Sequence, residues 1–223
     1  GSYYCEKCNT AALVEVNCET DFVAKTDEFK NLVAEIAKQI VKTNPADVDA
    51  LLASEYEGST IADMITAKVA IGEKITVRRF VRYQAEHGMV DTYIHMGGKV
   101  GVIVELKCDE VSDAVKEVAH DVALQIAAAS PVAPEYVRRS EVDPSHLEHE
   151  KEILIAQARN EGKPEKIVPK IVEGRLNAFF KEVVLLEQPF VKDPSKTVGD
   201  LFKEVGGNAT AFARVEVGKG EEE

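Results

Sequence analysis

Cysteines and histidines are the residues of this chain whose types and spacing come closest to a chemical site. Cys5 and Cys8 form a Cys-x-x-Cys pair, half of the ligand spacing of a tetrahedral zinc site, and no second such pair follows to complete it. We therefore predict two reduced thiols in a hairpin turn and no metal. In the stretch His146-x-x-His149-Glu150, the two histidines are three residues apart and share one helix face, but without a third partner group this favours a solvated surface.

Motifs for nucleotide or nucleophile chemistry are absent from the sequence. None of GxxxxGK[ST], GxGxxG, GxSxG or HExxH occurs in it. These are the patterns that cradle phosphates or activate a nucleophile or a water molecule. We therefore expect no catalytic residues, no cofactor and no enzyme activity.

The charge of the chain argues against a direct role with nucleic acid. The 27 Lys and Arg residues face 39 Asp and Glu residues, a formal net charge of -12, which repels phosphate backbones. Hydrophobic residues make up 45% of the chain, yet no apolar run approaches the roughly 20 residues that a membrane helix needs. We predict a globular protein of the cytoplasm or of an organellar matrix that contacts no membrane.

One aromatic residue lies in an unexpected place. Phe22 sits in the polar stretch VNCETDFVAKTDEF, residues 16–29, directly after a strand-like apolar run. A side chain of this size is normally buried. It is either folded back against its own first helix, near Phe29 and Leu32, or offered to a partner. The residues alone leave both alternatives open.

An internal repeat indicates where Phe22 belongs. LVEVNC at 13–18 matches IVELKC at 103–108 at an offset of 90 residues (103 minus 13), and AEIAKQI at 34–40 matches HDVALQI at 120–126 at an offset of 86 (120 minus 34). The second copy is thus four residues shorter in the stretch where the first has TDFVAK. Phe22 therefore lies in a connecting loop unique to the first copy, where specialisation is expected.

Each copy predicts a β-hairpin followed by an amphipathic helix, the second hairpin turning on the two residues Gly97-Gly98. A stretch of high helical propensity from about Pro144 to Glu182 is broken by EGKP at 161–164, which predicts two helices folded back on each other. Pro169 should kink or delay the second of them. In chain order we further predict a strand at 74–83, a loop at 188–191, a short helix at 197–205 and a last strand at 211–217.

Together these patterns predict an α+β protein with two duplicated units of antiparallel β-sheet packed with helices. The first unit spans residues 1–86 and carries the TDFV loop. The second spans residues 87–223, with the helical hairpin inserted at about 143–182. A finger of two helices cannot bury all of its apolar surface alone, which leaves open a homodimer through the hairpin.

Several segments resemble translation elongation factor Ts, in the order of that family. They are NCETDFVAKTDEF, IGEKITVRRF at 71–80, YIHMGGKVGVIVEL at 93–106, GKPEKIVPKIVEGRL at 162–176 and QPFVKDPSKTVGDL at 188–201. The resemblance runs from about Ala11 to Val217. Family members usually begin with a small ubiquitin-associated-type domain of three helices, and this chain starts in the first hairpin. We therefore expect it to represent the core region of the family.

The resemblance implies a guanine-nucleotide exchange factor for elongation factor Tu, the GTPase that delivers aminoacyl-tRNA to the ribosome. In the family, the TDFV loop inserts beside the partner's nucleotide site and displaces elements that hold Mg²⁺ and the phosphates. By position, this assigns Thr20, Asp21, Phe22 and Val23 to the insertion.

The resemblance also implies a second contact. Gln125 and Ile126 fall on a helix that corresponds to a partner-contacting segment, with Gln125 where many relatives have His. The alternative function is a non-enzymatic, dimeric interaction protein or chaperone-like protein that uses the helical hairpin and binds no GTPase.

Overall fold

The computed structural model describes residues 1–68, 72–129 and 132–220. The chain divides into two compact units, one of Gly1–Ala127 with Gly206–Glu223 and one of Ala128–Val205. The boundary expected between residues 86 and 87 separates the two copies of the repeat, whereas the two compact units are defined by their internal contacts. The expected boundary therefore stays a prediction about the duplication.

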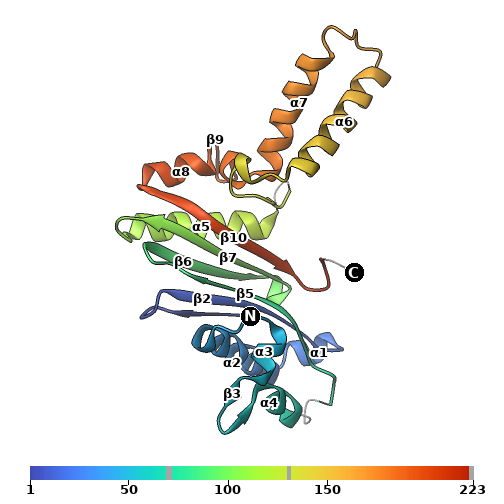
Figure 1. Cartoon of the computed structure of the whole chain (residues 1–223). Helices are drawn as coiled ribbons and strands as arrows, with labels where there is room; N and C mark the ends of the chain where they lie inside the picture. Colours follow the sequence, from blue (N-terminus) through green and yellow to red (C-terminus); the bar gives the residue numbers. More distant parts are fainter. Residues whose placement is uncertain (69–71, 130–131, 221–223) are drawn as a thin grey trace. The chain divides into compact units, whose positions relative to one another are not determined.

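The first copy of the repeat forms a three-stranded antiparallel sheet and a helical layer (Figure 1). Its strands are β1 (Ser2–Cys5), β2 (Thr10–Asn17) and β5 (Thr76–Gln84), in the order β1-β2-β5. The strand predicted at 74–83 is therefore confirmed as the third strand. Between β2 and β5 lie α1 (Asp21–Ala24), α2 (Asp27–Thr43), α3 (Val48–Ala53), the small hairpin β3 (Glu55–Tyr56) and β4 (Ser59–Thr60), and α4 (Ile61–Ala67).

The second copy repeats this arrangement. Its strands are β6 (Gly88–His95), β7 (Val100–Cys108) and β10 (Gly207–Glu216), and their order in the sheet is β10-β7-β6. In the chain, the helix α5 (Asp113–Ala128) follows β7. The α+β class with duplicated sheets is confirmed. The last strand begins at residue 207, four residues before the predicted start, because a bulge between Ala209 and Ala211 interrupts the period-two pattern.

Period-two alternation along β2 explains how the layers pack. Ala12, Val14 and Val16 face α2 in one buried cluster. Ala11 and Leu13 point to the opposite face, where they pack with Val90 and Ile103 of the second sheet. Because both faces of β2 are covered, it reads as a nearly continuous apolar run.

The strand register confirms the duplication. In the first hairpin the last pair before the turn is Cys5 with Thr10, and in the second it is His95 with Val100, both shifted by 90 residues (95 minus 5, 100 minus 10). The prediction of a two-residue turn at Gly97-Gly98 was wrong. The loop spans the four residues 96–99 and contains a short 3₁₀ turn, Met96–Gly98, in which all three residues have positive φ.

The third strands carry equivalent bulges. The register between β2 and β5 shifts between Glu15 and Val16, and the register between β7 and β10 shifts opposite Glu105, the repeat counterpart of Glu15. The extra residue is Arg78 in one sheet and Thr210 in the other. Each contacts the glutamate of its own copy, at 3.6 Å and 2.7 Å respectively.

The second unit contains the predicted helical hairpin, α6 (Pro144–Asn160) and α7 (Val168–Val183). Pro169 is the second residue of α7, which confirms that it delays the start of this helix. The helices are sealed together by an apolar cluster of Leu154, Ala158, Val168 and Val172.

The remaining elements of this unit are β8 (Pro189–Phe190), β9 (Asp193–Thr197) and α8 (Val198–Glu204). The prediction of a loop at 188–191 was therefore wrong in part, since Pro189 pairs with Thr197 and Phe190 with Asp193. Strands this short lack a readable alternation. Among the described residues, no helix is both long enough and apolar enough to span a bilayer.

Candidate partner-binding site

The segment that holds Phe22 folds as a single helical turn, α1, between β2 and α2. Thr20 caps it, and its hydroxyl accepts the backbone N–H of Val23 at 3.4 Å. The side chain of Phe22 is 88% exposed, whereas Phe29 and Leu32 are buried in the core. The alternative in which Phe22 folds back against its own helix is therefore contradicted.

The turn is fastened to the core on the side opposite to Phe22. Val23 and Ala24 pack against the buried cluster under the first sheet. Thr26 donates its hydroxyl to the carbonyl of Val23 at 2.7 Å and also accepts the N–H of Phe29, which caps α2. Because neighbouring residues of a helix point about 100° apart, anchoring Val23 and Ala24 leaves Phe22 directed into solvent.

Glu73 holds the other end of the turn. Its carboxylate accepts the backbone N–H groups of Glu19 and Thr20, both at 2.9 Å, and the hydroxyl of Thr20 at 2.5 Å. The hydrogen bond from the Thr20 hydroxyl, more than the backbone bonds, holds the pKa of Glu73 below its ordinary value. A carboxylate that accepts three donors fixes the backbone geometrically.

Sequence reasoning did not select Glu73. A signal for it exists, however, because the antiparallel pairing of Asn17 with Thr76 places residues just before β5 beside residues just after β2. Glu73 is the acidic residue within that reach. Its role becomes visible only once the register of these two strands is known.

Asp21 forms an ion pair with Lys99 of the β6–β7 loop, at 3.5 Å. Both side chains are more than half exposed, so this pair contributes little to stability in water. The pair links the Phe22 turn to the four-residue loop of the second hairpin, which begins at the exposed Met96. Asp21 can exchange Lys99 for a group on a partner at small cost.

Gln125 and Ile126, the other predicted contact residues, lie elsewhere in the same unit. Gln125 is 4% exposed and Ile126 is fully buried on the inner face of α5. Thr20, Asp21 and Phe22 are exposed and Val23 is half-buried beside them, whereas Gln125 and Ile126 do not reach the surface. A role for Gln125 and Ile126 in partner binding stays a prediction, and their burial does not favour direct contact.

The cysteines and histidines of the sequence do not assemble into a ligand cluster. Within residues 1–68, 72–129 and 132–220, no group of three or more His, Cys, Asp or Glu residues could hold a metal ion. His146 turns to Tyr136, whose hydroxyl lies 3.0 Å from Nδ1, and to the ring of Phe179, rather than to His149.

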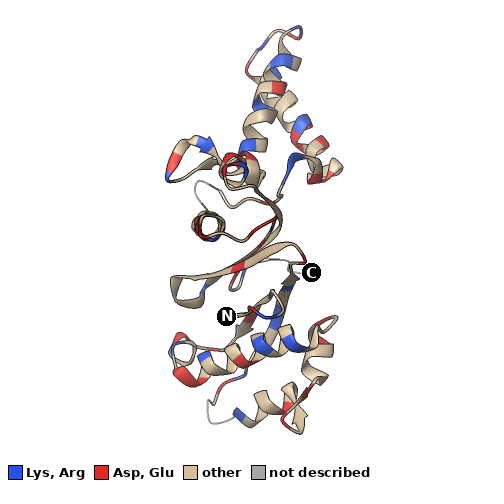
Figure 2. Ribbon diagram, turned by 90° about the vertical axis from the view of Figure 1, so that its left-hand side faces the viewer, with Lys and Arg blue, Asp and Glu red and all other residues tan. Residues whose placement is uncertain are grey.

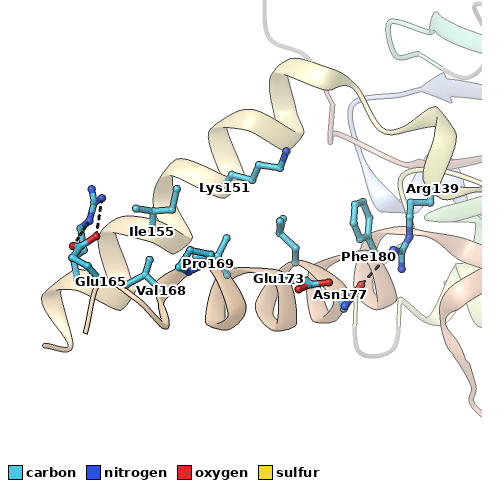
Figure 3. Close-up of a pocket in the computed structure, with 12 residues that line it drawn as sticks. Arg139, Lys151, Ile155, Glu165, Val168, Pro169, Glu173, Asn177 and Phe180 are labelled. Carbon is cyan, nitrogen blue, oxygen red and sulfur yellow. Dashed lines mark hydrogen bonds and ion pairs between the residues drawn. The ribbon is translucent and has the colours of Figure 1, made fainter. Parts of the chain in front are cut away.

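A groove of about 520 Å³ lies between the helices of the second unit (Figure 3). Its floor is apolar, with Ile155, Val172 and Phe180 among its residues. Cations at the rim already have partners, because Arg159 pairs with Glu165 at 2.9 Å and Arg139 with Glu187 at 2.7 Å. Figure 2 shows the two signs of charge interspersed along this hairpin. The groove thus offers apolar surface without a strong net charge.

An exposed aromatic on a turn that is held at both ends, within a duplicated α+β fold, is typical of the class of protein-binding modules. Comparison with known proteins narrows this class. The family model for elongation factor TS matches residues 19–219. Elongation factor Ts of Bifidobacterium longum (strain DJO10A) is 49% identical over 218 residues, covering 96% of this chain and 74% of the relative.

Two further relatives belong to the same family. Elongation factor Ts of Clostridium tetani is 47% identical over 229 residues, and that of Clostridium perfringens (strain SM101) is 44% identical over 227 residues. Each alignment covers 98% of this chain and 74% of the relative. The chain belongs to the elongation factor Ts family, and its role is in translation elongation.

Proposed function

We propose that this protein is a guanine-nucleotide exchange factor that binds elongation factor Tu and promotes release of GDP. The loop with Asp21 and Phe22 inserts near the Mg²⁺ and phosphate site of the partner. The observation that carries this proposal is the 88% exposure of Phe22 on a turn that Glu73 and the core hold in one conformation. Because the protein acts in translation, we place this activity in the cytoplasm or an organellar matrix.

The energetics of Phe22 fit an exchange factor. Burying a phenylalanine that was exposed to water yields about 1.5–3 kcal/mol, and every 1.4 kcal/mol is a factor of ten in affinity. If Phe22 is buried only in the nucleotide-free state of the partner, this difference weakens nucleotide binding by the same factor. The partner then releases GDP faster without any covalent step on this protein.

Pre-organisation adds to this effect. A loop that must be ordered on binding loses conformational freedom at that moment, which reduces the affinity. The hydrogen bonds to Glu73 and the packing of Val23 and Ala24 order the turn beforehand. The Asp21–Lys99 pair is weak enough to be replaced by a charged group of the partner.

The test is the rate of release of a fluorescent GDP from elongation factor Tu, followed by stopped flow at increasing concentrations of this protein. We expect wild-type protein to accelerate release and Phe22→Ala to lose at least about tenfold of that acceleration. Val111→Ala is the matched control, because Val111 is an exposed apolar residue in the equivalent connection of the second copy. Equal rates for wild type and Phe22→Ala would refute the proposal.

A second candidate function is a dimeric or chaperone-like interaction through the helical hairpin, without a GTPase partner. It is favoured by the groove of about 520 Å³ between α6 and α7. It is also favoured by two exposed apolar side chains nearby, Ile153 in α6 and Ile167 directly before α7. Sedimentation equilibrium distinguishes it from the first candidate. A dimer that the double variant Ile153→Asp, Ile167→Asp abolishes, together with a silent Phe22→Ala, would support this candidate.

A further inference from the structure

The turn of the first hairpin carries two thiols whose presence the proposed exchange function does not explain. Cys5 ends β1, and Cys8 lies in the four-residue turn that leads to Thr10. The turn closes with a hydrogen bond from the N–H of Asn9 to the carbonyl of Glu6 at 3.3 Å. This hydrogen bond closes the turn between Glu6 and Asn9, so Cys8 lies inside the turn and Cys5 lies directly before it.

The side chain of Cys8 turns back toward the backbone of Cys5. The Cys8 thiol lies 3.8 Å from the backbone carbonyl of Cys5, to which it donates a hydrogen bond. Asn9 adopts a left-handed conformation, with φ of 48°. Its side-chain amide donates to the carbonyls of Ala85 and Gly88, at 3.0 and 2.9 Å. The turn is therefore held in shape, and the approach of the two cysteines is a fixed feature of the fold.

Cys8 is also the more accessible thiol of the pair. It is exposed, whereas Cys5 is half-buried. Hydrogen bonds from the side chain of Cys5 and then from the hydroxyl of Thr10 lower the pKa of the Cys8 thiol. A lower pKa raises the fraction of thiolate near neutral pH, and the thiolate is the form that oxidants attack.

The other two cysteines lack this combination. Burial, and then the charge of Glu73, raises the pKa of Cys18. Cys108 is buried, and its pKa is raised by that burial and by Asp109. Neither has a second cysteine three residues away. The chain thus contains one exposed thiol of lowered pKa, with a second thiol three residues away.

We propose that Cys5 and Cys8 form a reversible oxidation site, which closes to an intramolecular disulfide with peroxide-class oxidants and reopens with thiol reductants. The Cys8 thiolate attacks the O–O bond of hydrogen peroxide and becomes a sulfenic acid, and the second oxygen leaves as hydroxide that is protonated to water. The Cys5 sulfur then attacks the Cys8 sulfur, the S–S bond forms, and the hydroxyl leaves as a second water.

In sum, the two thiols lose two protons and two electrons, and one peroxide becomes two waters. A dithiol reductant returns the two electrons and two protons by thiol–disulfide exchange. Cysteines that are accessible, of lowered pKa and next to a resolving thiol have the properties of redox-responsive pairs. Disulfides of proteins in reducing compartments are usually of this transient kind.

This site is separated from the Phe22 turn by the length of β2. The strand has eight residues, which at about 3.3 Å per residue places the two ends about 25 Å apart. Oxidation of the turn and insertion of Phe22 are therefore separable properties. We expect Cys5→Ser and Cys8→Ser to keep wild-type acceleration of GDP release.

The experiment treats the reduced, intact protein with hydrogen peroxide, alkylates the remaining thiols after denaturation, and maps the tryptic peptides by mass. Lys7 lies between the two cysteines, so trypsin separates them unless a disulfide joins the fragments. We expect a linked pair of peptides that excludes alkylation at Cys5 and Cys8 and is split by dithiothreitol. Fragmentation should show Cys18 alkylated, and Cys108 should be alkylated in its own peptide.

Two variants make the result specific. In Cys5→Ser the resolving thiol is gone, so Cys8 should stop at the sulfenic acid, which dimedone traps. Cys18→Ser is the control and should behave as wild type. A Cys8–Cys18 link, disulfide-linked dimers of the chain, or dimedone labelling of Cys8 in the wild type without a Cys5–Cys8 link would overturn the proposal. Zinc that protects both thiols until a chelator removes it would overturn it as well.

Discussion

The two copies of the repeat share a three-stranded sheet and a helix, and they differ in the connection between the second strand and that helix. Thr26 caps α2 through the N–H of Phe29, and Ser112 caps α5 through the N–H of Val115, at the same offset of 86 residues (112 minus 26). Between the matching cysteines and these helices, the first copy has the eight residues 19–26 and the second has the four residues 109–112. The difference consists of the turn that carries Phe22.

This comparison shows how a duplicated fold acquires a specialised surface. The strands, the bulges and the helix caps were retained in both copies because they form one shared core. The connection between strand and helix lies on the surface and does not form this core. It can therefore lengthen without disturbing the packing of the sheet and the helix. The extra residues place an aromatic that is 88% exposed where the second copy has Val111, which is 39% exposed.

Substitutions at the equivalent glutamates of the two copies, Glu15 and Glu105, should differ most in their effect on stability. The side chain of Glu15 is fully buried and is bound by Arg79 at 2.6 Å and by the N–H of Gly218 at 3.2 Å. Glu105 is only half-buried and accepts the Thr210 hydroxyl. We expect Glu15→Gln to lower the free energy of unfolding by about 3 kcal/mol and Glu105→Gln by about 1 kcal/mol.

Urea denaturation followed by circular dichroism measures both variants. Equal losses of unfolding free energy for the two variants would contradict the view that the buried ion pair of Glu15 stabilises the first copy more than the hydrogen bond of Glu105 stabilises the second.

The contact between the two sheets offers a second matched pair. Gly101 corresponds to Ala11 in the repeat (101 minus 11 is 90), and a Cβ on Gly101 would lie 2.5 Å from Cδ1 of the buried Leu13. We expect Gly101→Ala to cost about 2 kcal/mol of stability by overpacking. Ala11→Gly should cost about 1 kcal/mol. A stabilised Gly101→Ala in thermal unfolding would show that the sheets can separate slightly without loss.

Glu73 should matter for exchange more than for stability. Glu73→Gln retains one acceptor for the loop but loses the charge that binds three donors at once. We expect acceleration of GDP release to fall about threefold, the order of an exposed charged interaction. Asp63→Asn is the control, since Asp63 is an exposed capping carboxylate of α4 that accepts from Ser59 and Thr60. A loss as large as that of Glu73→Gln in this control would argue against a specific positioning role.

We expect the smallest effect from pH, through titration of the Glu73 carboxylate that accepts hydrogen bonds from Glu19 and Thr20. The Thr20 hydroxyl, and then the backbone N–H groups, hold the pKa of Glu73 below the ordinary 4.5. A depressed pKa means that the stabilisation is present above pH 4.5 and disappears as the pH falls through the lower, folded-state value. The amide signals of Glu19 and Thr20 in an NMR titration should shift together with a midpoint below 4.5. A midpoint above 4.5 would contradict the hydrogen bonds to Glu73.

Local patterns predicted much of this structure. The alternation around Leu13 and Ile103 indicated both hairpins, and Pro169 indicated where α7 begins. The repeat isolated the Phe22 loop, but the exposure of Phe22 could not be decided from its own sequence, because either alternative has the same local pattern. The exposure depends on Val23 and Ala24 packing into a core that distant residues complete.

Long-range pairing accounts for what the sequence did not predict. Glu73 becomes a partner of Thr20 only through the register of β2 and β5. Gln125 lies on a helix whose inner face is set by the second sheet, so its burial could not be read from its residue type. The start of β10 could not be predicted either, because the bulge beside Ala209 interrupts the alternation. This bulge arises from the pairing of β10 with β7, which the local sequence does not show.

The most direct test of the account replaces residues 19–26 with Asp-Glu-Val-Ser, the residues 109–112 of the second copy. This exchange keeps a serine cap before α2 and removes the Phe22 turn, so the first copy acquires the connection of the second. Stopped-flow release of GDP from elongation factor Tu is the measurement, with circular dichroism as a check on folding. We predict a folded protein that no longer accelerates release. A folded protein that accelerates release like the wild type would contradict the claim that exchange resides in this connection.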